Sequence, residues 1–218
     1  MKRSAVLVCL ALSYALAGCV TETPHRIVPL SPPAQMPTYA AGTCQTELLD
    51  RGGHFRSIAD RNYGSGCATI DSVRLLSVRS DEGNVTLSGL GPLSCTVALK
   101  AAAWVQYGVD RAARAELGSP VVSIETLGSY ACRNVANSDR RSAHATANAI
   151  DVSAFDLADG RKISVLRGWT GGTSSERRFL RLVAKSACRR FSTVLDPDYN
   201  EVHRDHLHLE LGASHFCR

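Results

Sequence analysis

The sequence predicts an α+β domain in which a mainly antiparallel sheet carries flanking helices on one side. Three observations lead to this expectation. Some segments alternate apolar and polar residues as strands do, others have helical spacing with caps, and the two kinds do not alternate regularly along the chain. With 218 residues, 44% of them hydrophobic and 21% charged, the chain also has an ordinary globular composition.

The first strands are expected as a hairpin, because apolar residues at 73–75 and 85–87 flank the turn sequence DEGN at 81–84. The segment 148–155 alternates again and places Asp151 on the face opposite its apolar neighbours. Further strands are expected at residues 121–127 and 206–211.

Helices are expected at residues 95–107, 110–117 and 174–188. Ser94 can cap the first helix, and Gly118 can end the second. Thr173 and Glu176 form a capping-box pattern that opens the third. The segment 44–66 is rich in turn residues and is expected to hold one short helix.

The first residues have the pattern of a signal peptide. A basic start is followed by an apolar run, Ser4 to Leu16, which is too short to span a bilayer core of ~30 Å. The sequence LAGC that ends at Cys19 resembles a bacterial lipobox, which implies a lipoprotein signal peptide at residues 1–18 and diacylation of Cys19. Val20 in the next position favours the outer membrane. The alternative is a plain secretory signal with an incidental cysteine.

Residues 19–43 are predicted to form a lipidated tether, because five of the eight prolines fall there. An extended chain of this length reaches roughly 70 Å. The folded domain is therefore expected at residues 44–218, on the periplasmic face of the bacterial cell envelope, held to the membrane by its N-terminal lipid.

Six cysteines remain after the leader and the lipidated position are set aside, and an even number in an exported chain indicates three disulfides. A cysteine-rich zinc site is disfavoured because the sequence has no C-x-x-C pair. Spacing alone allows 15 connectivities. The favoured pairs are Cys44–Cys67, Cys95–Cys132 and Cys188–Cys217.

Candidate metal ligands lie in two segments, 142–151 and 201–208. In a strand, His206 and His208 would project from one face. His144 precedes Asp151 closely enough for a loop to bring both to that face. Two imidazoles and one carboxylate, with a fourth position open, form the ligand set of a catalytic zinc, although other divalent metals accept it.

The order His144-x6-Asp151, preceded by Ser142 and followed by His206-Leu207-His208, resembles the zinc signature of the LAS metallopeptidases. That group includes D-alanyl-D-alanine peptidases, L-alanyl-D-glutamate endopeptidases and the zinc domain of hedgehog. Residues 44–218 resemble more closely the bacterial extensin-like C-terminal family. The segments that carry this second match are GSYACRN, SAHATANAIDV, ERRFLRLV and HRDHLHLEL.

The resemblance implies a disulfide-stapled, hedgehog/D-Ala-D-Ala peptidase-like fold and assigns roles to single residues. His144, Asp151 and His208 would bind Zn²⁺. His206 would stabilise the charged intermediate or orient a ligand, Asp205 would be the general base, and Arg133 would anchor a substrate carboxylate. For Arg133 a structural ion pair is an equal alternative. His203 is expected to be a loop residue.

The sequence departs from the metallopeptidase signature in two places. Ala147 replaces its glycine, and Asp205 replaces the more frequent glutamate. In a regular strand Asp205 would point away from the ligands, so it can act only if the strand begins or bulges at His206. Glu201 is the fallback base, and Glu210 is a candidate hydrogen-bond partner for a ligand.

The leading functional hypothesis is a zinc-dependent peptidase or amidase that hydrolyses peptidoglycan stem peptides. Two alternatives are a non-catalytic, metal-stabilised cell-wall-binding or scaffold lipoprotein and a periplasmic metal-handling protein. Nucleic-acid binding is not expected, because the chain is exported and its net charge of +5 is not gathered into a basic, aromatic stripe.

Overall fold

The structure is a computed structural model that describes residues 43–218. The predicted signal peptide at 1–18, the lipidation site Cys19 and the tether up to residue 42 lie outside the described residues. Residue 43, expected at the end of the tether, opens the first helix. Within the described part of the chain, no helix has the length and apolar character needed to cross a bilayer.

A ten-stranded sheet organises residues 43–218, with the order β1-β4-β5-β7-β8-β11-β10-β12, while β6 pairs with β4 and β9 with β8. All pairings are antiparallel except β5–β7 and β10–β12. A separate hairpin joins β2 to β3. The strands are β1 (Gly53–Ile58), β2 (Arg61–Gly64), β3 (Cys67–Thr69), β4 (Ser72–Arg79), β5 (Asn84–Ser88), β6 (Leu93–Ser94), β7 (Val121–Gly128), β8 (Ala149–Leu157), β9 (Lys162–Ser164), β10 (Thr193–Leu195), β11 (Leu207–Glu210) and β12 (Phe216–Cys217).

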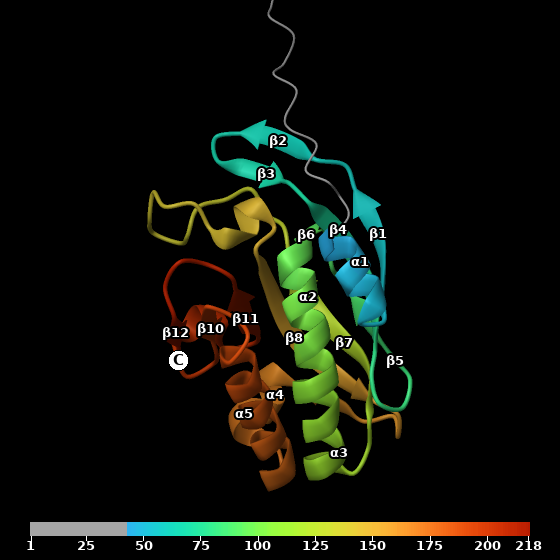
Figure 1. The fold of residues 1–218 in the computed structure, drawn as a ribbon. Coiled ribbons are helices and arrows are strands. Elements are labelled where there is room, and N and C mark those ends of the chain that lie inside the picture. Colours follow the sequence, from blue (N-terminus) through green and yellow to red (C-terminus); the bar gives the residue numbers. More distant parts are fainter. Residues whose placement is uncertain (1–42) are drawn as a thin grey trace, which may run out of the picture. The chain divides into compact units, whose positions relative to one another are not determined.

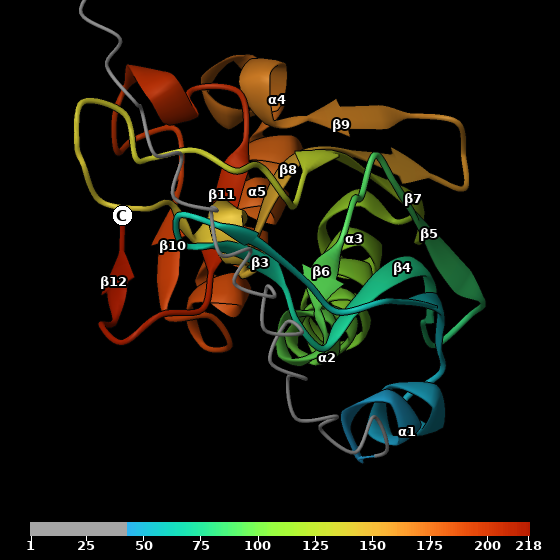
Figure 2. The same cartoon turned by 90° about the horizontal axis from the view of Figure 1, so that it is seen from above.

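The helices α2, α3 and α5 pack on one face of this sheet, and the sheet curves around them (Figures 1 and 2). The predicted mixed architecture, with a mostly antiparallel sheet, is confirmed. The helical segments are α1 (Thr43–Asp50), α2 (Cys95–Trp104), the π-helix η1 (Val105–Asp110), α3 (Arg111–Leu117), the 3-10 helix η2 (Ala143–Thr146), α4 (Val165–Gly171), α5 (Ser174–Cys188) and the 3-10 helix η3 (Glu201–His203).

The predicted caps determine where these helices begin and end. The Ser94 side chain accepts a hydrogen bond from the first turn of α2, and Gly118 ends α3 in the left-handed conformation with φ 69°. Thr173 and Glu176 form the complete capping box at the start of α5. The capping residues alone were therefore enough to predict where α2 and α5 begin and where α3 ends.

Several short elements had no signal in the sequence. The segment predicted as turns and one helix also contains β1, which begins with an irregularity in register between His54 and Phe55 and shows no clean alternation. The strands β9, β10 and β12 have two or three residues each and exist because they pair with longer strands. Such edge pieces are set by tertiary pairing rather than by propensity.

Two of the predicted disulfides are wrong. Cys44 pairs with Cys95 and Cys67 with Cys132, so Cys44–Cys67 and Cys95–Cys132 are not formed. Helix α1 packs against α2, which begins at Cys95, and β3 packs against η2, next to the loop that contains Cys132. The pairing follows these contacts, which sequence spacing does not reveal.

The third disulfide, Cys188–Cys217, is present as predicted. It joins the end of α5 to β12, which pairs in parallel with β10. The end of the chain is thereby fastened to the sheet close to β11.

The core supports β8 and β11 from one side only. Ile150, Val152, Leu207 and Leu209 are all buried in the main apolar cluster. Because strand side chains alternate between faces, the residues between them face away from that core. Asp151 and His208 are therefore held on the opposite face by well-packed neighbours.

Candidate metal centre

Three side chains from separate elements meet on this opposite face: His144 of η2, Asp151 of β8 and His208 of β11. The register of the two strands places His208 directly opposite Asp151. His144 Nε2 lies 3.2 Å from Asp151 Oδ2 and 3.3 Å from His208 Nδ1, and His208 Nδ1 lies 2.8 Å from Asp151 Oδ1. The structure thus brings together the three residues predicted as metal ligands.

The outward nitrogen of each imidazole has its own acceptor. His144 Nδ1 lies 3.2 Å from the backbone oxygen of Ser129, and His208 Nε2 lies 3.0 Å from Glu210 Oε2. A ring N–H that donates outward leaves the inward nitrogen as the lone-pair donor. Both rings are therefore oriented so that His144 Nε2 and His208 Nδ1 can act as ligands.

The distances within the cluster fit a tetrahedral ion. Ligands about 2.0–2.1 Å from zinc are about 3.3 Å from each other in that geometry. The two imidazole nitrogens are 3.3 Å apart, His144 Nε2 lies 3.2 Å from Asp151 Oδ2, and His208 Nδ1 lies 2.8 Å from the other carboxylate oxygen, Oδ1. Two imidazoles and one carboxylate suit Zn²⁺ or a similar divalent metal, and they leave one coordination position for water or substrate.

The electrostatics of the cluster favour a cation. Burial alone would raise the pKa of Asp151, but hydrogen bonds with His144 and His208 lower it below its usual range. Burial lowers the pKa of His208, yet its hydrogen bonds to Asp151 and Glu210 prevail and raise that pKa to about 9. Two carboxylates around one imidazole make the site attractive to positive charge, whether a proton or a metal ion.

A tight turn presents His144. The Ser142 side chain caps η2 by accepting a hydrogen bond from the His144 backbone N–H at 3.3 Å. The turn closes at Ala147, whose φ of 56° and ψ of 27° lie in the left-handed region. A residue with a Cβ pays roughly 1–2 kcal/mol there, whereas glycine does not. This conformation explains why the resembling signature has glycine at the position of Ala147.

His206 and Asp205 form a hydrogen-bonded pair beside the cluster. Strand β11 begins at Leu207, so alternation does not force Asp205 away from the ligands. Asp205 Oδ1 lies 2.9 Å from His206 Nδ1, and His206 Nε2 lies 3.6 Å from Asp151 Oδ1. The Asp205 side chain remains 45% exposed. Asp205 therefore contacts His206 at Nδ1, and the other ring nitrogen of His206, Nε2, is the one that faces the metal ligand Asp151.

His203 is closer to this site than its expected role as a loop residue suggests. Its ring centroid is 5.2 Å from that of His206 and 5.9 Å from that of His208. Burial, together with the neighbouring His206 and His208, lowers the pKa of His203 to about 4, so the ring is neutral. The spacing H-x-x-H-x-H was the sequence signal for this third imidazole.

Two other candidate residues, Arg133 and Glu201, have side chains whose recorded contacts are with other residues. Arg133 is exposed, and the contact recorded for its guanidinium is with the Asn134 backbone oxygen at 3.4 Å. Glu201, the fallback base, is exposed and pairs with Arg204. Among residues 43–218 the structure records no contact between either side chain and the three ligands.

The structure contains two further groupings of candidate ligands, which include Cys188 with Cys217 and Cys44 with Cys95. All four of these cysteines are in disulfides. They therefore offer no thiolate, and the histidine cluster is the grouping with free ligand atoms in the part of the chain that the structure describes.

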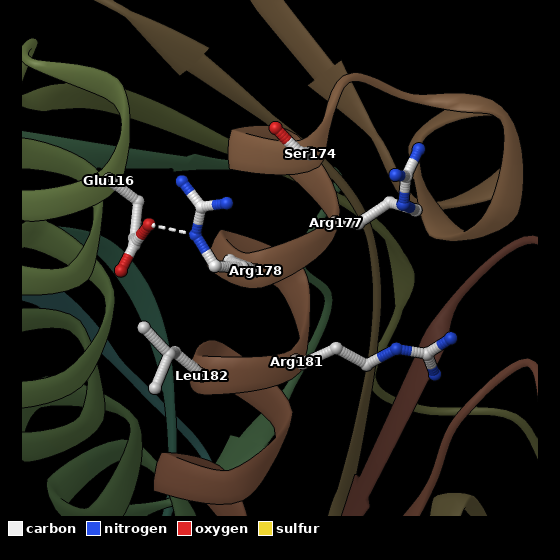
Figure 3. A pocket seen from close by; sticks show the side chains of 6 residues that line it. All are labelled: Glu116, Ser174, Arg177, Arg178, Arg181 and Leu182. Carbon is white, nitrogen blue, oxygen red and sulfur yellow. Dashed lines mark hydrogen bonds and ion pairs between the residues drawn. The ribbon is translucent and has the colours of Figure 1, made fainter.

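A cavity of about 530 Å³ lies on α5 and contains none of the cluster residues. Figure 3 shows Arg178 pointing to Glu116, while Arg177 and Arg181 point the other way. The Arg178 Nε is 2.7 Å from Glu116 Oε2, and Arg181 pairs with Asp198. This hollow, called the arginine hollow below, has charges that are largely paired within the chain.

The fold and the cluster together define a disulfide-stapled α+β domain with a candidate metal site between η2, β8 and β11. The family described as extensin-like protein C-terminus matches residues 42–218, and the chain belongs to that family. Comparisons with curated proteins and with solved structures find no match to the chain.

Proposed function

We propose that this protein is a metal-dependent, zinc-type peptidase or amidase that hydrolyses peptidoglycan stem peptides. The observation that carries the proposal is the arrangement of His144 Nε2, Asp151 and His208 Nδ1 at mutual distances of 2.8–3.3 Å, each imidazole oriented by an outer partner. The proposal includes the hedgehog/D-Ala-D-Ala peptidase-like fold that the sequence signature implies.

His144, Asp151 and His208 are the residues that would hold the ion. When bound, a divalent ion such as Zn²⁺ would acidify a water molecule and polarise the substrate carbonyl. Burial of both imidazoles, with His144 3% and His208 7% exposed, keeps bulk water from competing with these contacts.

His206 and Asp205 are the residues that move the proton. The resemblance names Asp205 as the base and His206 as the stabilising group. With Asp205 bonded to Nδ1, His206 Nε2 is free to take the proton of the attacking water and deliver it to the amide nitrogen as the C–N bond breaks. Asp205 then stabilises the imidazolium, so the two side chains act as one acid–base unit.

The same residues have a second, non-catalytic interpretation. The cluster joins three separate elements, so a bound ion would stabilise the domain as a structural crosslink does. This supports the alternative of a metal-stabilised cell-wall-binding or scaffold lipoprotein. For both interpretations we propose that the protein lies in the bacterial cell envelope, anchored to the outer membrane through lipid on Cys19.

The experiment uses the exported chain loaded with Zn²⁺ and purified peptidoglycan peptides, with products identified by mass spectrometry and metal by elemental analysis. We expect about one ion per chain and hydrolysis that chelation stops. His208→Ala should lower metal affinity more than about 100-fold and abolish hydrolysis, because it removes a ligand rather than an outer partner. The exposed His54 provides the matched control, since His54→Ala should change neither property.

Asp205→Asn separates the two interpretations. It should keep the metal but slow hydrolysis by about 10²–10⁴-fold, the usual contribution of acid–base catalysis. Hydrolysis that survives both chelation and His208→Ala would refute the proposed mechanism. A protein that binds and is stabilised by the ion yet cleaves no wall peptide would establish the scaffold alternative.

A further inference from the structure

A second hollow of about 270 Å³ begins at Asp205, beside the candidate metal site. Its floor is formed by Ser153 and Ala154 of β8, which follow the ligand Asp151 along the same strand. Residues of β7 line one side, and residues of β9 and α4 line the other. We call this hollow the β8 groove.

The sheet topology explains why the groove exists. Strand β7 pairs with one edge of β8 over nearly its whole length, so β9 and β11 must share the other edge. Strand β11 ends its pairing at Val152, and β9 begins at Ala154. Ser153 lies between these two pairings. Asp205, two residues before β11, lines the groove on the β11 side of this position, and α4, which follows β9, lines it on the β9 side.

Each side of the groove carries one exposed leucine among polar residues. Leu127 is 58% exposed and Leu166 is 52% exposed, and they stand on opposite walls. Ligand pockets combine apolar lining with a few polar groups, and exposed apolar side chains gathered in one place often mark interaction sites. These walls suit small apolar side chains of a bound peptide.

The groove contains one cation that is free to bind a ligand. Lys162 is paired with Glu125 and lies 3.5 Å from Asp156, so its charge is already compensated. Arg167, in contrast, has no hydrogen bond or ion pair recorded from its guanidinium to any residue within 43–218. A guanidinium fork of this kind matches a carboxylate in bidentate geometry.

An ion pair limits the length of the groove. Glu125 of β7 and Lys162 of β9 meet across β8, at the level of Ala154 and Asp156. Ala154 lies three residues beyond Asp151, which is about 10 Å along a strand at ~3.3 Å per residue. That length accommodates two or three residues of an extended peptide, not a long chain.

We infer that the β8 groove binds the short, carboxylate-terminated end of the substrate peptide and that Arg167 holds its terminal carboxylate. The inference rests on the proposed peptidase function and extends it to a substrate class: peptides whose free C-terminus lies two or three residues from the bond that is cleaved. Arg133, implied by the resemblance, is the competing anchor.

The experiment measures binding and hydrolysis separately on the Zn²⁺-loaded exported chain. The probes are N-acetylated tripeptides of alanine in all combinations of chirality, each as the free acid and as the C-terminal amide. Binding is measured by calorimetry, and cleavage by mass spectrometry. The variants are Arg167→Gln, Arg133→Gln and, as a matched control that lines the arginine hollow and not the β8 groove, Arg177→Gln.

We expect at least one free acid to bind at least tenfold more tightly than its amide. Arg167→Gln should remove that preference, whereas Arg133→Gln and Arg177→Gln should keep it. Equal binding of all acids and amides, or no binding of either, would overturn the inference, as would loss of the preference in Arg133→Gln but not in Arg167→Gln. Binding that is specific for the free acid but without cleavage would support the β8 groove as a carboxylate site and refute the peptidase function. Cleavage at equal rates for acid and amide would support the peptidase function and refute the groove as a carboxylate site.

Discussion

The histidine cluster and the arginine hollow show that the size of a cavity and the chemistry of a site are separate properties. The arginine hollow has a volume of about 530 Å³, but its three arginines extend from a single helix, α5, and Glu116 and Asp198 already neutralise two of them. The cluster occupies little space, yet three elements and a core-backed strand pair force its nitrogen and oxygen atoms together. Buried titratable groups whose pKa values are shifted by one another indicate a functional site more strongly than the volume of a hollow does.

The disulfides offer the strongest test of this contrast. Cys67–Cys132 fastens β3 to the loop between Ser129 and His144, while Cys188–Cys217 fastens the end of α5, the helix of the arginine hollow. Replacing either pair with serine should cost about 2–5 kcal/mol of unfolding free energy.

Metal affinity should distinguish the two disulfide variants. Loss of Cys67–Cys132 loosens the carbonyl that orients His144 and should weaken metal binding about tenfold, within the range of outer-partner effects. Loss of Cys188–Cys217 releases β12, which β10 separates from the ligand strand β11, so metal affinity should stay nearly unchanged. Chemical denaturation and competition with a chelator give both quantities, and equal losses of affinity would contradict the contrast.

Glu210 beside the histidine cluster and Glu116 in the arginine hollow allow a second comparison, in which the expected effects are smaller. Glu210→Gln removes the carboxylate next to His208 Nε2 and should reduce metal affinity about 10–100-fold, with little effect on the fold. Glu116→Gln breaks the pair with Arg178, whose side chain is largely exposed, and should cost at most about 1 kcal/mol of stability with no effect on metal. If Glu116→Gln also lowered metal affinity, the hollow and the cluster would be coupled and the comparison would fail.

The smallest expected effect tests the turn that presents His144. Ala145 and Ala147 are both fully buried in this turn, but only Ala147 has a positive φ. Ala145→Gly should destabilise the protein by about 1 kcal/mol through chain entropy, whereas Ala147→Gly should be nearly neutral because it relieves the left-handed strain. Thermal unfolding of the two variants measures the difference, and equal destabilisation would show that Ala147 carries no strain.

Local chemistry in the sequence predicted the features that depend on near neighbours. Alternation at Ile150–Val152 and Leu207–Leu209 placed Asp151 and His208 on the solvent side of a core, and the caps at Ser94 and Thr173 determined the helix starts. The structure shows the three predicted ligands converging, as those patterns require.

Features that depend on distant contacts were not predictable. The pairing of Cys44 with Cys95 follows the packing of α1 on α2, which no spacing encodes. The β8 groove arises because β9 and β11 share one edge of β8, so Arg167 had no sequence signal linking it to Asp205. The contact of Asp205 with His206 likewise depends on where β11 begins.

The most direct test of the central claim is a crystal structure of the Zn²⁺-soaked protein with anomalous scattering recorded at the zinc edge. The account predicts one strong peak about 2.0–2.1 Å from His144 Nε2, His208 Nδ1 and an Asp151 oxygen, with a non-protein ligand in the fourth position. A peak elsewhere, or a fourth protein ligand that closes the site, would contradict it.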